Sequence, residues 1–154
     1  MVALIRAEAE RQGVDPKLAL ATAEVESNFN PRAAGDLGWA TWNDGARYKQ
    51  HVLGNDALTS NPARLDPSVW HSYGLFQLLA PYHVTGREHP SVLYDPAVNA
   101  QRGVAYLRAL AKRYGGDPAQ VRLAYAGALH LDAASQERAL TRFAKAFEQW
   151  GGLG

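Results

Sequence analysis

Two carboxylates stand near the end of an apolar segment, in the stretch AEVESNFNPRA that runs from Ala23 to Ala33. On a helix, residues two apart point about 200° away from each other, so Glu24 and Glu26 belong to different faces. Glu24 shares its side with Lys17 and Leu20, and we expect its carboxylate to be solvated. The side chains on the face of Glu26 are small: Ala19, Thr22 and Ala23.

Small neighbours allow another element to pack closely over Glu26 and to remove its carboxyl group partly from water. A desolvated carboxylic acid keeps its proton to higher pH, which suits it to donate that proton near neutrality. Glu26 is therefore a candidate general acid. The alternative is a surface or capping role, which is the commoner use of a glutamate at a helix end.

Asp-Pro pairs mark where the positioning helices begin. The aspartate accepts a hydrogen bond from a free helix N–H, and proline fits the first helical position. We expect three of the four pairs to start long helices: Asp15–Pro16, Asp95–Pro96 and Asp117–Pro118. The fourth pair, Asp66–Pro67, is expected to start only a short turn.

Apolar residues recur at helical spacing through most of the chain, and no segment alternates with a period of two. Three of the predicted helices cover residues 2–12, 96–114 and 133–150. Another starts at residue 16 and ends before Asn30–Pro31, where proline interrupts the helix, and one starts at residue 118 and continues through the sequence QVRLAYAGAL. The sequence therefore predicts a mostly α fold.

Composition limits the classes of protein to consider. With 154 residues, 47% hydrophobic and 20% charged, the chain is expected to form one domain, 1–154, with a real core. A net charge of +1 gives no basis for predicting nucleic-acid binding. The absence of cysteine excludes thiolate chemistry, and no apolar segment approaches the roughly 20 residues that span a bilayer.

Residues 36–72 differ from the rest, because they are rich in tryptophan and broken by glycine and proline. We expect a long aromatic insertion with a short helix near residues 44–53. Trp39, Trp42 and Trp70 are needed for a small core of its own, and the alternative is that one of them stacks on a sugar ring.

Four motifs occur in a fixed order along the chain. They are ESNFNPRA at 26–33, YGLFQL at 73–78, LYDPAVNAQRGVAYL at 93–107 and LAYAGA at 123–128. This succession resembles the soluble lytic transglycosylases. The resemblance implies a lysozyme-like (goose-type) helical fold and action on peptidoglycan strands of the bacterial cell wall, without a metal or other cofactor.

The resemblance also implies roles for individual residues. Glu26 corresponds to the single catalytic acid, and the neighbouring Ser27 helps to hold the site. Tyr125 corresponds to a tyrosine that faces the acid. The groove-lining segment corresponds to Gly74, Leu75, Phe76 and Gln77, with Phe76 in place of methionine.

Some of these residues have a second interpretation. Phe76 could instead belong to the hydrophobic core, and the side-chain amide of Gln77 needs hydrogen-bond partners, which are either backbone groups or the sugar. Tyr125 has packing as its default role. The family's asparagine after this tyrosine is missing, since Ala126 follows directly, and the chain between Pro31 and Gly74 is longer than in compact family members.

The implied reaction cleaves the β-1,4 bond after N-acetylmuramic acid and forms a 1,6-anhydro sugar, with Glu26 acting first as acid and then as base. A hydrolase of the goose-type lysozyme kind is an alternative, and needs a second carboxylate about 6.5–9.5 Å away if it inverts. A non-catalytic glycan-binding or structural virion module is the other alternative. The hydrolase would draw its second carboxylate from the insertion: Asp36, Asp44, Asp56 or Asp66.

Three expectations complete the sequence-based account. The start MVALIRAEAERQ lacks a signal peptide, which favours a phage- or virion-delivered enzyme or a domain of a longer protein. One apolar stripe near the C-terminus is expected to belong to the core, and the alternative is that a partner protein docks on it; its residues are Leu140, Phe143, Phe147 and Trp150. The histidines fit no zinc-ligand spacing and are expected at the surface or as caps: His51, His71, His83, His89 and His130.

Overall fold

The structure is a computed structural model that describes residues 1–152. The chain forms two compact units, one made of Met1–Phe29 with the segment from Ala100 on, and the other of Asn30–Asn99. The aromatic insertion predicted at 36–72 lies inside the second unit. Among the described residues, no helix has the length and apolar character that crossing a bilayer requires.

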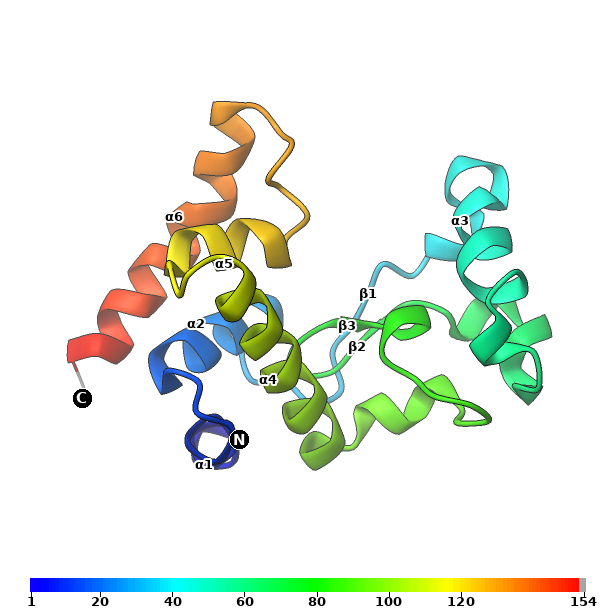
Figure 1. The fold of residues 1–154 in the computed structure, drawn as a ribbon, viewed down its shortest axis with the longest axis horizontal. Coiled ribbons are helices and arrows are strands. Elements are labelled where there is room, and N and C mark those ends of the chain that lie inside the picture. Colours follow the sequence, from blue (N-terminus) through cyan, green and yellow to red (C-terminus); the bar gives the residue numbers. More distant parts are fainter. Residues whose placement is uncertain (153–154) are drawn as a thin grey trace. The chain divides into compact units, whose positions relative to one another are not determined.

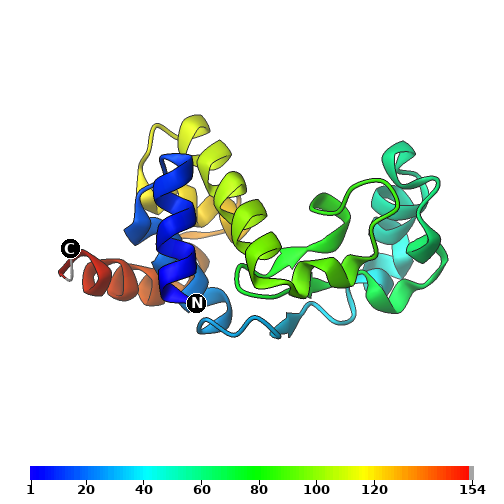
Figure 2. The ribbon, with the colours of Figure 1, turned by 90° about the horizontal axis from the view of Figure 1, so that it is seen from below.

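The first unit is helical. Its α2 packs against both α1 and α6, and α5 also packs against α6. Figure 1 looks down the axis of α1, and Figure 2 shows that helix along its length. The helices are α1 (Val2–Gln12), α2 (Pro16–Ser27), α4 (Pro96–Arg113, which begins at the end of the second unit), α5 (Pro118–Tyr125) and α6 (Ala133–Gly152).

The predicted Asp-Pro starts are confirmed. Each aspartate accepts a backbone N–H two residues further on, at 2.9 Å for Asp15, 3.1 Å for Asp66, 2.9 Å for Asp95 and 3.0 Å for Asp117. The pair at Asp66 starts only the short 3-10 turn Pro67–Val69, as expected. The sequence therefore fixes where these elements begin through local capping chemistry.

Two helices end earlier than predicted. The last residue of α2 is Ser27, because Asn28 adopts a left-handed conformation with φ 51° and donates its N–H to Glu24 O at 2.8 Å. Asparagine tolerates this conformation better than most residues. Similarly, α5 stops at Tyr125, where Gly127 has φ 66° and Ala128 N donates to Leu123 O at 2.8 Å.

A small antiparallel sheet in the second unit was not predicted. The strands β1 (Ala34–Gly35), β2 (Ser72–Tyr73) and β3 (Leu78–Leu79) lie in the order β1-β2-β3. In the register, Ala34 is opposite Tyr73, which is opposite Leu78. Strands of two residues are too short to produce an alternating pattern in the sequence.

The rest of the second unit consists of short helical turns. The helix expected near residues 44–53 is present as α3 (Ala46–Tyr48), which continues into a π-helical turn at Lys49–Leu53. The 3-10 turns are Trp39–Gly45, Asp56–Leu58, Pro62–Leu65, Pro67–Val69, Ala80–Tyr82 and Pro90–Tyr94.

The insertion has its own core, as predicted. Trp39 and Trp70 are fully or almost fully buried, and Trp70 donates its indole N–H to Ala63 O at 3.0 Å. Trp42 is 42% exposed. Of these three tryptophans, Trp42 alone is exposed to solvent.

Two other expectations are corrected in part. In the stripe on α6, Phe143 is buried, whereas its companions Leu140, Phe147 and Trp150 are half-buried. His89 caps a turn, accepting the N–H of Ser91 at 3.1 Å, as expected. His71 is buried instead, because its ring stacks on Tyr73 with centroids 4.0 Å apart.

Candidate functional site

Glu26 lies in the last turn of α2, and its side chain keeps 19% of its surface exposed. Its carboxylate forms an ion pair with Arg122 of α5, in which Nη1 of the arginine donates to Oε1 at 2.5 Å. The Arg122 side chain is only 8% exposed. Because the C-terminal end of a helix carries partial negative charge, a carboxylate placed there needs a compensating cation, and Arg122 supplies it.

Tyr125 follows Arg122 by three residues on α5, so the two side chains lie on one face of that helix. The guanidinium carbon of Arg122 lies 6.0 Å from the centre of the Tyr125 ring. Burial, and after it the negative charge of Glu26, hold the pKa of Tyr125 well above its usual range. The phenol is therefore protonated at neutral pH and able to donate a hydrogen bond.

Ser27 directly follows the proposed acid. Its hydroxyl donates to Ala23 O at 3.2 Å, one helical turn back, and the residue is half-buried. The serine is thus tied to the same last turn of α2 as Glu26.

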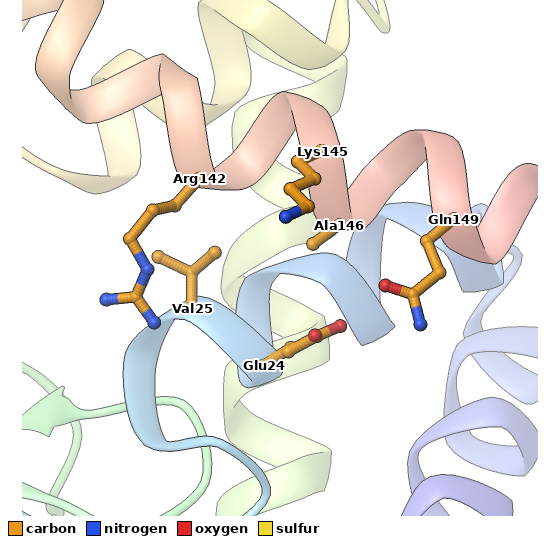
Figure 3. Close-up of a pocket in the computed structure, with 6 residues that line it drawn as sticks. All are labelled: Glu24, Val25, Arg142, Lys145, Ala146 and Gln149. Carbon is orange, nitrogen blue, oxygen red and sulfur yellow. The ribbon is translucent and has the colours of Figure 1, made fainter.

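Glu24 does not behave as a solvated carboxylate, which corrects the expectation from the helix geometry. Its Oε2 accepts the indole N–H of Trp150 at 2.6 Å. It also lines a pocket of about 300 Å³ between α2 and α6 (Figure 3). In that view Lys145 and Gln149 point from α6 toward Glu24, while Arg142 lies beside Val25. Glu24 therefore joins two helices and belongs to a different surface from Glu26.

The segment Gly74–Gln77 lies in the second unit, between β2 and β3, and is held by Asn99. This asparagine is 1% exposed, and its Nδ2 donates to Tyr73 O and to Leu93 O, both at 2.8 Å. Its Oδ1 accepts the N–H of Phe76 at 2.9 Å. One buried side chain thus fixes the backbone on both sides of the turn.

Gly74 is required by this arrangement. Its φ of 73° is in the left-handed region, and a Cβ there would lie 2.5 Å from Nδ2 of Asn99 and 2.8 Å from Leu93 O. Both distances are shorter than any real Cβ contact. Any other residue at position 74 would displace either the Gly74–Gln77 segment or the Asn99 side chain that holds it, which we call the Asn99 clamp.

The side chains of the Gly74–Gln77 segment differ in how accessible they are to a ligand. Those of Leu75 and Phe76 are fully buried, so the structure does not support the expectation that Phe76 faces an open groove. Gln77 has backbone partners, since its Nε2 donates to Ala33 O and Gly74 O, both at 3.1 Å. A Cβ at Gly35 would collide with Oε1 of Gln77, so a larger residue there would make the Gln77 amide move.

The structure thus places the predicted residues in two groups. Glu26, Ser27 and Tyr125 belong to the first unit, and Gly74–Gln77 belongs to the second. Sequence reasoning missed Arg122 and Asn99. The sequence feature that could have indicated Arg122 is a single cation within the apolar helical segment VRLAY. For Asn99 it is the position of an asparagine in the first turn of the helix that starts at DPAVN.

Titratable side chains suggest no metal centre in the described part of the chain. Among residues 1–152, no three His, Cys, Asp or Glu side chains are grouped so that they could hold an ion. The groups in contact at Glu26 are one carboxyl group, an arginine and a tyrosine.

The chain matches the family described as transglycosylase SLT domain over residues 3–145. It therefore belongs to that family.

Curated relatives carry a more specific name, membrane-bound lytic murein transglycosylase C. The protein from Yersinia enterocolitica is 34% identical over 115 residues, which are 73% of this chain and 25% of the relative. The one from Serratia proteamaculans is 32% identical over 115 residues, with the same shares, and one from Haemophilus influenzae is 30% identical over 111 residues, which are 72% and 24%. This chain thus spans about a quarter of the length of these relatives. No solved structure matches it significantly.

Proposed function

We propose that this protein is a lytic transglycosylase that cleaves peptidoglycan strands between N-acetylmuramic acid and N-acetylglucosamine. The observation that carries the proposal is the partly exposed carboxyl group of Glu26, set beside the buried Arg122 and the half-buried Tyr125. Membership of the SLT family and the names of the relatives support it. The site of action is then the bacterial cell wall.

In the proposed reaction Glu26 first gives its proton to the glycosidic oxygen as the bond to the anomeric carbon breaks. The acetamido group of the muramic acid assists at that carbon, so a second carboxylate is not needed. The C6 hydroxyl oxygen then attacks the anomeric carbon, and its proton returns to Glu26. The product is a 1,6-anhydro sugar, and no water is consumed.

The other residues have supporting roles in this proposal. Tyr125, protonated at neutral pH, donates a hydrogen bond to Glu26 or to the acetamido group. Ser27 helps to hold the last turn of α2. The segment Gly74–Gln77 contributes backbone groups and the Gln77 amide to the binding of the glycan, with Leu75 and Phe76 buried beneath them.

Mass spectrometry of the muropeptides released from purified peptidoglycan tests this proposal. A transglycosylase releases 1,6-anhydro-muramic products, each lighter by one water than the reducing sugar that a hydrolase releases. Reducing-end products would replace the proposal with hydrolysis, and binding to peptidoglycan without any release would replace it with a non-catalytic module.

A further inference from the structure

Arg122 is buried without the partners that a structural arginine normally has. Its side chain is 8% exposed, and its Nε is buried with no hydrogen-bond acceptor. Within residues 1–152, Glu26 is the hydrogen-bonding and ion-pair partner of its guanidinium, which otherwise lies near the ring of Tyr125. Burial of a guanidinium costs several kcal/mol unless its charge and its donors are satisfied. The position of Arg122 is therefore explained by Glu26 rather than by packing.

The contact is specific to one carboxyl oxygen. Nη1 donates to Oε1 of Glu26, while Oε2 has no hydrogen-bond partner among the described residues. In a carboxylic acid, an oxygen that accepts a hydrogen bond from a guanidinium is the carbonyl oxygen, because the hydroxyl oxygen holds the proton. The proton of the acid form is thus directed to Oε2.

We propose that Arg122 is a positioning residue for the acid Glu26: it holds Oε1, keeps the transferable proton on Oε2, and stabilises the carboxylate that proton transfer leaves behind. This inference rests on the proposed function of Glu26. Because its positive charge lies beside the carboxylate that proton transfer leaves behind, Arg122 favours the first step of the reaction, in which the glycosidic bond breaks.

Several other titratable groups of this unit have neighbours of their own among residues 1–152. Tyr125 of α5 is neutral below its raised pKa, and Tyr106 of α4 is its aromatic neighbour, with ring centroids 5.2 Å apart. On α6, Arg142 and Lys145 line the pocket at Glu24. On α1, Glu8 and Arg11 pair with each other. Within the part of the chain that the structure describes, Arg122 is the cation in direct contact with Glu26.

Two substitutions separate the charge of Arg122 from its hydrogen bond. Arg122→Gln keeps an N–H donor but removes the charge, and Arg122→Lys keeps the charge but loses the planar fork. Arg142→Gln is the matched control, since it removes an exposed arginine from the Glu24 pocket. The readouts are kcat and KM for release of anhydro-muropeptides as a function of pH, with circular dichroism to confirm folding.

For Arg122→Gln we expect maximal kcat to fall about tenfold, while KM changes less than about twofold, because only the proton-transfer step is affected. Arg122→Lys should recover part of the lost kcat, because it keeps a positive charge beside Oε1, and Arg142→Gln should match the parent. An unchanged kcat in Arg122→Gln, or a fall in kcat that merely follows a loss of folded protein, would overturn the inference.

A second measurement keeps this test separate from the test of the proposed function. A double-mutant cycle of Glu26→Gln and Arg122→Gln, followed by urea unfolding, measures the coupling of the two side chains without turnover. We expect the stability losses of the two single variants to be non-additive in the double variant. If the parent is inactive but the losses are non-additive, the proposed reaction fails while the coupling stands; if the losses are additive, the positioning role fails whatever the activity.

Discussion

Removal of the Asn99 clamp should cost more than removal of an ordinary asparagine. In Asn99→Ala, three buried hydrogen bonds are lost, those to Tyr73 O and Leu93 O at 2.8 Å and the one from Phe76 N at 2.9 Å. Each is worth about 1 kcal/mol net, and buried partners left unpaired add to that, so we expect the free energy of unfolding to fall by about 3 kcal/mol. Urea unfolding followed by circular dichroism measures this loss.

Asn61→Ala is the matched control, because Asn61 is also buried and also makes three bonds. It donates to Gly86 O at 2.9 Å and Glu88 O at 2.8 Å, and it accepts from Ala63 N at 2.9 Å. Both variants should lose similar stability. At a temperature where both remain folded, only Asn99→Ala should raise KM for peptidoglycan, because only Asn99 fixes the Gly74–Gln77 segment.

A loss of less than about 1 kcal/mol in Asn99→Ala, as a solvated asparagine would give, would contradict the role of Asn99 in holding the Gly74–Gln77 segment. A rise in KM for Asn61→Ala as large as that for Asn99→Ala would contradict the role of this segment in glycan binding.

Three further outcomes follow from the structure. Gly74→Ala should lower the free energy of unfolding by at least about 2 kcal/mol, because its φ of 73° is strained for alanine and its Cβ would meet Asn99; a neutral result in urea unfolding would refute this. Trp150→Phe should lose about 1–2 kcal/mol with turnover unchanged, because it removes the N–H bonded to Glu24. Since the pKa of Tyr125 is raised on folding, its contribution to stability is complete below pH of about 10 and is lost as pH rises through the higher folded value; Tyr125→Phe should therefore show a shallower alkaline loss of stability than the parent.

Local signals in the sequence predicted the helical framework. Each Asp-Pro pair carries its capping bond within two residues, so the starts of α2, α4 and α5 depend on no distant contact. The ends of α2 and α5 were misplaced, because the left-handed conformations of Asn28 and Gly127 depend on which backbone carbonyls are free at that point.

The chemistry of the site needed tertiary structure. Glu26 and Tyr125 were identified from their motifs, but the ion pair joins residues 96 positions apart, and helical spacing cannot predict such a contact. The same reason applies to Glu24. Its exposure was inferred from α2 alone, whereas its partner Trp150 is 126 positions away on α6.

A phage or virion context and a single-domain organisation of residues 1–154 remain predictions. The family match and the fold are independent of both, since they depend on residues 3–145 and on the helices of the first unit.

The most direct test of the central claim compares two substitutions on one helix. Glu26→Gln and Glu24→Gln make the same chemical change two residues apart, and muropeptides released from purified peptidoglycan are analysed by mass spectrometry for each and for the parent. We predict 1,6-anhydro products from the parent and from Glu24→Gln, and a loss of at least about a hundredfold in Glu26→Gln, as expected for removal of a general acid. Undiminished release by Glu26→Gln, or equal losses in both variants, would contradict the assignment of Glu26 as the acid.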